Sequence, residues 1–166
     1  MAGRRLLTSD RITEVKYPGA IPMPMLRGEF PDAGEQSHEE LLAAYGTVLT
    51  ETVETVGVEE IVAETGLDQA TVTAFADGDI ADRTLDEAVA VLATGPNRPD
   101  ADALQAEAQD ILLMGMTTAV MDVESLASGI DDELEPKEIQ QKIEGRYPVT
   151  LAEYALLHSY IEGEKR

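Results

Sequence analysis

The chain has 166 residues, and its 33 acidic residues against 12 basic ones give a formal net charge of −21. It contains no cysteine, which excludes disulfides, thiolate metal sites and cysteine nucleophiles. Apolar residues make up 43% of the chain, enough for the core of one domain or two small ones. The longest uncharged helical stretch, residues 111–121, is shorter than the roughly 20 residues of a membrane span, so we expect no membrane partner.

Residues 1–34 differ from the rest of the chain in charge and composition. Five basic and four acidic residues give this segment a net charge of +1, and it holds four of the eight prolines. It shows no sustained helical or strand periodicity, which is typical of an extended tail. We therefore expect residues 1–34 to be disordered or loosely laid on the surface. Arg4 and Arg5 are not followed by an apolar stretch of signal length, so we expect a cytoplasmic protein.

Residues 38–93 carry the signals of four consecutive helices. Apolar residues recur at intervals of three and four, and a glycine or a loop ends each stretch, which predicts helices over 38–56, 58–65, 69–77 and 85–93. Ser37 with Glu40, and Thr84 with Glu87, have the spacing of capping boxes at the first and fourth of these helices. No stretch alternates between apolar and polar residues, so we expect an all-α fold.

A second series of the same kind follows from residue 100. Its predicted helices cover 101–119, 123–128, 136–145 and 151–161. Thr150 and Glu153 form another capping box. Residues 111–121 carry no charge although 27% of the chain is charged. We therefore expect an apolar central helix, with Met114 buried, between the two series or in a dimer seam.

Landmarks of the first series return in the second after 65 to 67 residues. The matched pairs are Val58 with Val123, Gly78 with Gly145, and Thr84 with Thr150. A nearly constant offset of this kind indicates an internal duplication. We expect two tandem four-helix repeats, at residues 35–97 and 98–166, which together form one compact unit.

The first repeat resembles a known DNA-binding module. Apolar residues flank a turn glycine, Gly66, and return at Val72 and Phe75. This pattern is similar to the phage-repressor-like helix-turn-helix family, over about residues 40–94 and, more loosely, 102–161. The resemblance implies that the third helix of a repeat enters the major groove of DNA and reads base edges.

The chain from about Leu26 onward, including residues 112–120, also resembles a small uncharacterised family of acidic haloarchaeal proteins. The composition agrees, because there are only four lysines and aromatic residues make up 4% of the chain. Carboxylates retain water in concentrated salt, where a Debye length of about 3 Å weakens their repulsion. We therefore expect a protein of a salt-adapted cell. This resemblance implies no activity.

The candidate nucleic-acid contacts lie on the third helix of the second repeat. They are the basic and amide side chains that can hydrogen-bond base edges, namely Lys137, Gln140, Gln141, Lys142 and Arg146. The alternative is that the lysines pair with nearby glutamates at helical spacing. The third helix of the first repeat offers only the weaker candidates Gln69, Thr71 and Thr73, between two acidic residues.

Two classes of function remain open. The first is a DNA-binding transcriptional regulator, and the alternative is a protein-interaction module or homodimeric adaptor that uses the same helices. We expect no enzyme, because the chain lacks nucleophile-elbow, Walker and dinucleotide motifs, and we expect His158 to be a packed residue. The acidic cluster Asp131–Glu135 lacks the ligand order of a calcium loop. We therefore expect no metal, no cofactor and no small-molecule substrate.

Overall fold

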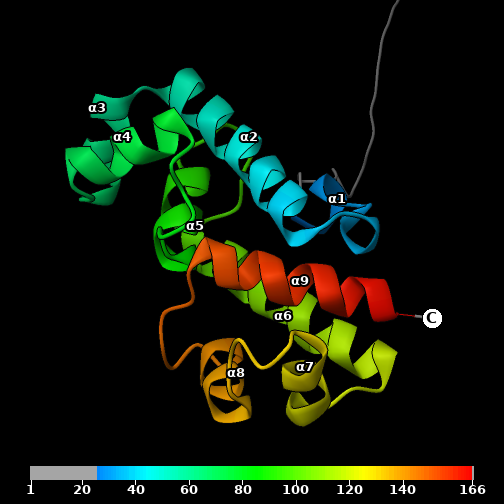
Figure 1. The fold of residues 1–166 in the computed structure, drawn as a ribbon. Helices are drawn as coiled ribbons and strands as arrows, with labels where there is room; N and C mark the ends of the chain where they lie inside the picture. Colours follow the sequence, from blue (N-terminus) through cyan, green and yellow to red (C-terminus); the bar gives the residue numbers. More distant parts are fainter. Residues whose placement is uncertain (1–25, 166) are drawn as a thin grey trace, which may run out of the picture.

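The computed structural model describes residues 26–165, and every regular element in this part of the chain is a helix (Figure 1). In chain order the elements are α1 (Leu26–Glu29), the 3-10 helix η2 (Ala33–Glu35), α2 (His38–Val56), α3 (Val58–Thr65), α4 (Gln69–Asp77), α5 (Leu85–Ala93), α6 (Ala101–Ala119), α7 (Val123–Gly129), α8 (Pro136–Ile143) and α9 (Leu151–Glu164). The all-α prediction is confirmed, and the helix boundaries fall within a few residues of those expected.

Local hydrogen bonds explain where these helices begin and end. Ser37 Oγ accepts the amide of Glu40 at 3.1 Å, and the Glu40 carboxylate accepts the amide of Ser37 at 2.9 Å. The predicted capping boxes at the starts of α5 and α9 are formed in the same way. Gly66 and Gly78 end α3 and α4 with left-handed φ angles of 77° and 80°, which a residue without Cβ adopts without strain.

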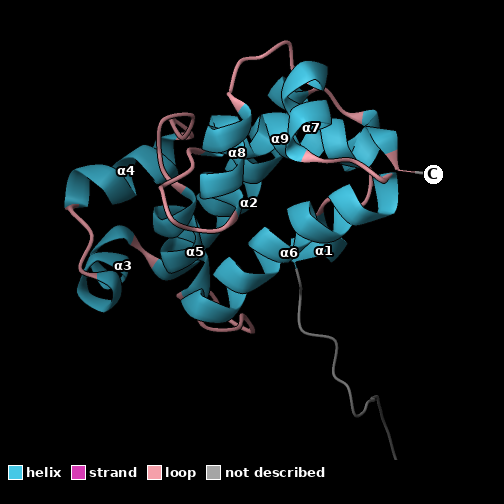
Figure 2. Cartoon of the chain, turned by 90° about the horizontal axis from the view of Figure 1, so that it is seen from below, coloured by secondary structure: helices cyan, strands magenta, loops and turns pink. Residues whose placement is uncertain are grey.

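Helices α2, α5, α6 and α9 form the centre of the molecule. Helix α2 packs against both α9 and α5, and α6 packs against the same two helices. The short helices α3 and α4 stand at one end, whereas α7 and α8 lie beyond α6 and α9 (Figures 1 and 2). The outer helices α4 and α8 are therefore held apart by the central four.

Two backbone segments that lie 66 residues apart meet between the starts of α5 and α9. The amide of Leu85 donates to the carbonyl of Val149 at 2.8 Å, and the amide of Leu151 donates to the carbonyl of Arg83 at 2.8 Å. The exchange forms an isolated antiparallel bridge in which Thr84 faces its sequence counterpart in the second series. The N-termini of α5 and α9 are thereby fixed against each other.

The hydrophobic core receives side chains from all the longer helices. Its largest fully buried side chains are Phe75, Leu41, Ile61, Leu104, Leu126, Ile139, Leu157, Ile161, Val72 and Val91. Each short outer helix contributes apolar residues from one face only. The outward faces of these helices are consequently available to solvent or to a partner.

Helix α6 is central, but it is not buried on all sides. Ile111, Leu112 and Met116 are buried, whereas Leu113 is 44% and Met114 58% exposed. The expectation that Met114 is buried is wrong, because the uncharged stretch has one face in the core and another face in solvent. A charge at position 114 therefore has no buried environment to disrupt in the single chain.

Residues 26–34, which the sequence placed in a tail that is disordered or loosely laid on the surface, pack on the helical body. Leu26 and Ala33 are buried, and the amide of Leu26 donates to Glu107 Oε1 of α6 at 3.0 Å. Element η2 lies against α9. The packed part of the chain thus begins at residue 26, and the remainder of the expected tail, residues 1–25, lies outside the described residues.

The substitution Gly34→Ala tests this docking of the N-terminal segment. A Cβ at position 34 would stand 2.7 Å from the carbonyl oxygen of Glu162 and 2.9 Å from the amide nitrogen of Gly163. Both are backbone atoms, so the segment has to shift, and we expect a loss of about 1–3 kcal/mol in the free energy of unfolding, measured by denaturant titration. Gly163→Ala, whose Cβ would meet an oxygen at 3.2 Å, should cost less. Unchanged or increased stability of Gly34→Ala would contradict the docked arrangement.

Candidate nucleic-acid interface

The five main candidate side chains lie on α8 and on the turn that follows it. Ile139 and Ile143 turn one side of α8 into the core. Gln140 lines a groove shared with α6, whereas Gln141 and Lys142 line a different groove beside Tyr147. The structure therefore brings the candidates onto one helix but does not gather them on one surface.

Carboxylates already bind three of these five side chains. Lys142 Nζ donates to Glu153 Oε1 at 2.6 Å, and the lysine side chain is only 15% exposed. Arg146 Nε donates to Glu144 Oε1 at 3.0 Å, and Gln140 Nε2 donates to Glu144 Oε2 at 3.2 Å. Lys142 thus pairs with α9 instead of along its own helix. Lys137 is exposed and pairs with no acidic side chain in the described part of the chain.

The two acceptor carboxylates have altered acidity. The hydrogen bond from Arg146 and that from Gln140 lower the pKa of Glu144. Burial pushes the pKa of Glu153 upward, but the hydrogen bonds from Lys142 and from the Thr150 amide outweigh this effect, so its pKa lies below the ordinary value. Both carboxylates are therefore ionised at neutral pH and hold their partners.

Helix α4 carries the weaker candidates. Gln69 and Thr73 are exposed, between the exposed carboxylates of Asp68 and Asp77. Thr71 is buried, and its Oγ1 accepts a hydrogen bond from Arg83 at 3.4 Å. Thr71 therefore does not belong to the outer face of α4.

Ion pairs within the chain bind basic side chains in other regions too. Arg83 pairs with Glu87, Arg98 with Glu29, and Lys165 with Glu162. A protein that binds a phosphate backbone needs cations that are free to replace its counterions. No described helix presents a row of unpaired cations of that kind.

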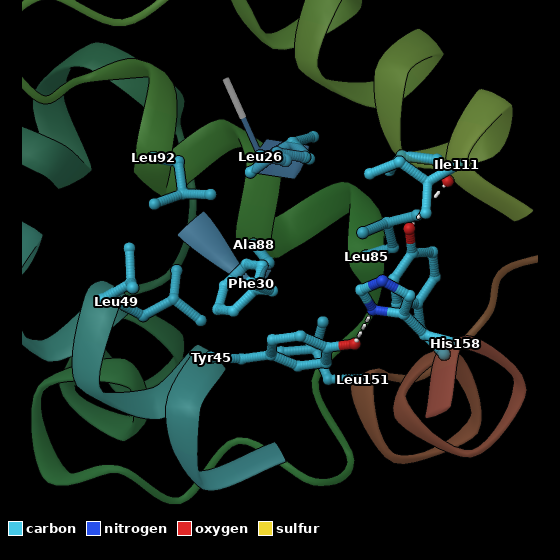
Figure 3. Close-up of a pocket in the computed structure, with 14 residues that line it drawn as sticks. Leu26, Phe30, Tyr45, Leu49, Leu85, Ala88, Leu92, Ile111, Leu151 and His158 are labelled. Carbon is cyan, nitrogen blue, oxygen red and sulfur yellow. Dashed lines mark hydrogen bonds between the residues drawn. The ribbon is translucent and has the colours of Figure 1, made fainter. Parts of the chain in front are cut away.

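A buried polar pair, not foreseen as a pair in the sequence, lies where α2 and α9 meet (Figure 3). The Tyr45 hydroxyl and His158 Nδ1 form a hydrogen bond of 2.7 Å, and Phe30 packs edge-on against both rings. The Tyr154 hydroxyl donates to the carbonyl of Ala108 at 2.7 Å. Tyr45 and His158 are 113 residues apart in the sequence. The one sequence signal for their contact is that each lies on the apolar face of its helix.

His158 is a packed residue, as the sequence predicts. It is 4% exposed, and burial lowers its pKa to about 4, although Glu162 acts in the opposite direction. The adjoining cavity has a volume of about 50 Å³ and an apolar lining that includes Leu49, Ala88 and Ile111. Ligand pockets typically measure roughly 300–1,000 Å³, so this cavity is a gap in the packing.

The fold and the surface define an acidic, all-helical protein whose described basic side chains are mostly paired. Among residues 26–165, no group of three potential metal ligands occurs. No single described helix is long and apolar enough to cross a membrane, and α6 and α7 pass such a test only together, as a pair bent by 93°.

The chain belongs to DUF5791, a family of unknown function, whose model matches residues 41–164. The match extends from α2 to the end of α9. The predicted membership of an uncharacterised family is confirmed. No curated protein and no solved structure gives a significant match.

The substitution His158→Gln should make the free energy of unfolding less dependent on pH below neutrality. Burial lowers the histidine pKa from 6.5 to about 4, so between these values the unfolded chain binds a proton that the folded chain does not. The stabilisation from neutral His158 is complete above its unfolded pKa, and about 3 kcal/mol of it is lost as the pH falls to the folded value.

Unfolding free energies of wild type and His158→Gln, measured by denaturant titration between neutral pH and the folded pKa, should therefore converge as the pH falls. His38→Gln, which changes an exposed histidine, is the matched control. A difference in unfolding free energy between wild type and His158→Gln that stays constant with pH would contradict the lowered pKa of His158.

Proposed function

We propose that the protein is a protein-interaction module and not an enzyme. The observation that carries this proposal is the engagement of Gln140, Lys142 and Arg146 by Glu144 and Glu153. A DNA-binding surface gains much of its affinity from cations that contact phosphates, and these cations would first have to leave their carboxylates. A protein partner needs no row of free cations, because burial of apolar surface supplies the affinity.

We further propose that the module consists of two copies of one helix-turn-helix-like unit, α2–α5 and α6–α9. The equal length of α2 and α6, 19 residues each, supports this, as do the φ angles of 80° at both Gly78 and Gly145. The exchange of equivalent hydrogen bonds at the Thr84–Thr150 bridge is the pattern that an approximate twofold axis produces. A duplicated unit offers two comparable outer surfaces, one around α4 and one around α8.

DNA-binding transcriptional regulation is the second candidate function. Helices α3 and α4 favour it, because only residues 66–68 separate them and Gly66 has the left-handed conformation that a helix-turn-helix turn uses. The corresponding connection between α7 and α8, residues 130–135, is twice as long. The unit α2–α5 therefore has the turn that better fits a helix-turn-helix, but its outer helix α4 carries no basic residue.

Selection from a random duplex pool separates the two candidates. The full-length chain, tested in about 0.1 M and about 2 M KCl, should enrich no sequence in either salt if it is an interaction module. When it is cross-linked in its own cells, it should carry cross-links to a second polypeptide chain, either another protein or another copy of itself.

An enriched DNA sequence would overturn the interaction proposal. The double variant Gln140→Ala with Gln141→Ala should then lose roughly 1–3 kcal/mol per base contact. Gln69→Ala with Thr73→Ala, its counterpart on α4, should retain the preference.

We also propose that the protein works in a salt-adapted cell. A net charge of −21 destabilises a compact chain by self-repulsion. The Debye length falls from about 10 Å at 0.1 M salt to about 3 Å at 1 M, which screens this repulsion. We expect the midpoint of thermal unfolding, followed by circular dichroism, to rise by several degrees on addition of molar KCl. Sucrose at equal osmolality should give a smaller rise, and equal effects of the two solutes would contradict the electrostatic cause.

A further inference from the structure

The C-terminal half of α6 carries an exposed surface without charge, which we call the α6 patch. Its members share one side of the helix and its end, and they are Leu113, Met114, Thr117, Thr118 and Val120. The three apolar side chains are 44%, 58% and 90% exposed, respectively. Thr117 Oγ1 donates to the carbonyl of Leu113 at 3.1 Å, so its hydroxyl is satisfied within the helix. The patch is consequently a weakly hydrated area on a strongly acidic protein.

Helix α2 provides an internal reference for this patch, because it has the same length as α6. The α2 residues at the same distances from the helix start are Thr50, Glu51, Glu54, Thr55 and Gly57. Two glutamates and a glycine thus occupy the places of Met114, Thr117 and Val120. The α6 patch therefore contains no acidic residue, whereas the equivalent positions of α2 include two.

The backbone at Val120 adds a second peculiarity. Val120 ends α6 in the left-handed conformation, with φ 55° and ψ 57°. A β-branched residue there is an outlier that costs about 1–3 kcal/mol, whereas glycine and asparagine adopt this conformation readily. Its exposed side chain recovers none of this cost within the single chain. A partner that covers the patch would provide the missing burial.

A groove beside the patch supplies a complementary shape. It has a volume of about 340 Å³ and lies between α6 and α8. Its apolar lining residues include Leu113, Met116 and Ile143, and its polar ones are Asp122, Gln140 and Glu144. A twofold interface brings the same surface of two copies together. Side chains that protrude from this surface must therefore fit into a groove on the same surface of the other copy. Leu113 lines the groove, and the exposed side chain of Met114 is its neighbour in the chain.

The charges along α8 are self-complementary as well. Lys137, Gln140 and Glu144 follow one another at spacings of three and four, so they share one side of the helix. Lys137 and Glu144 are both exposed. When α8 lies antiparallel to α8 of a second copy, each Lys137 stands opposite Glu144 of the other chain. This arrangement gives two attractive pairs across the contact between the copies.

We propose that the α6 patch and its groove are the interface of a homodimer, with a second copy of this chain as the occupant. The inference rests on the proposed interaction function and names the partner. Two chains that each carry −21 repel one another, and the α6 patch is a place where they can touch through side chains that carry no charge. Salt screens the remaining repulsion, so the dimer becomes tighter as salt rises, whereas DNA binding becomes weaker.

Sedimentation equilibrium of the full-length chain tests the proposal. In about 2 M KCl the mass should approach twice the 17.9 kDa of one chain, and the dissociation constant should be roughly tenfold lower than in about 0.1 M KCl. A single-chain mass in both salts, at every concentration reached, would overturn the proposal.

Surface variants then locate the interface. Met114→Glu introduces the residue of the equivalent α2 position, and Val120→Asn relieves the strained backbone while removing an apolar contact. Each should raise the dissociation constant roughly tenfold or more. The melting temperature of the dissociated chain should stay unchanged for the first and stay unchanged or rise for the second. Tyr147→Glu, at a 55% exposed position outside the patch, is the matched control and should leave the dimer intact. Wild-type dimerisation of both patch variants would overturn the interface.

A charge exchange tests the pairing of α8. Lys137→Glu and Glu144→Lys should each weaken the dimer, because each places like charges opposite one another, and the double variant should recover it. Arg146→Gln, which breaks only the pair with Glu144 inside the chain, should have little effect. Failure of the double variant to recover would overturn the antiparallel pairing. If the chain sediments as a single copy and enriches no DNA sequence, only the homodimer is excluded and the interaction function stands. If it enriches a DNA sequence, the interaction function is excluded whatever the mass.

Discussion

The backbone exchange between residues 83–85 and 149–151 is the constraint on which the arrangement of the central helices depends. Its two hydrogen bonds pair polar groups beside the buried side chains of Leu85, Val149 and Leu151, where unpaired groups would cost about 1–3 kcal/mol each. Because α5 and α9 both start at this bridge, their directions are fixed together. Helices α2 and α6 each pack on both of them, so the positions of α4 and α8 follow from the same joint.

The sequence predicted those features that local chemistry determines. The capping pair Ser37 and Glu40, like those of α5 and α9, requires only a hydroxyl and a carboxylate three residues apart, and a spacing of this kind is visible without the fold. The offset that matched Thr84 with Thr150 concerned two residues that also meet in space. Helix boundaries and capping pairs were therefore accessible from the sequence alone.

Features that depend on tertiary packing were not accessible. A run of uncharged residues shows that one side of α6 is buried but not that Met114 is left outside, since that depends on which neighbours cover the helix. The packing of Leu26 and Ala33 has no signal in the sequence, because four-residue and three-residue helices are too short for a periodic pattern. The pairing of Lys142 with Glu153 joins two helices, and only the fold brings them within 2.6 Å.

The α8 surface shows that composition alone does not reveal which cations are paired inside the chain. Its cations stand out in a sequence otherwise poor in them, and this contrast predicted contacts with the base edges of DNA. In the folded chain Lys142 and Arg146 instead neutralise Glu153 and Glu144, so their presence offsets the acidity of their surroundings. The folded chain shows a different contrast, because the exposed α6 patch carries no charge where α2 has glutamates. In a chain of net charge −21, an area that lacks carboxylates is the more informative signal, because solubility favours a carboxylate there and contact with a partner does not.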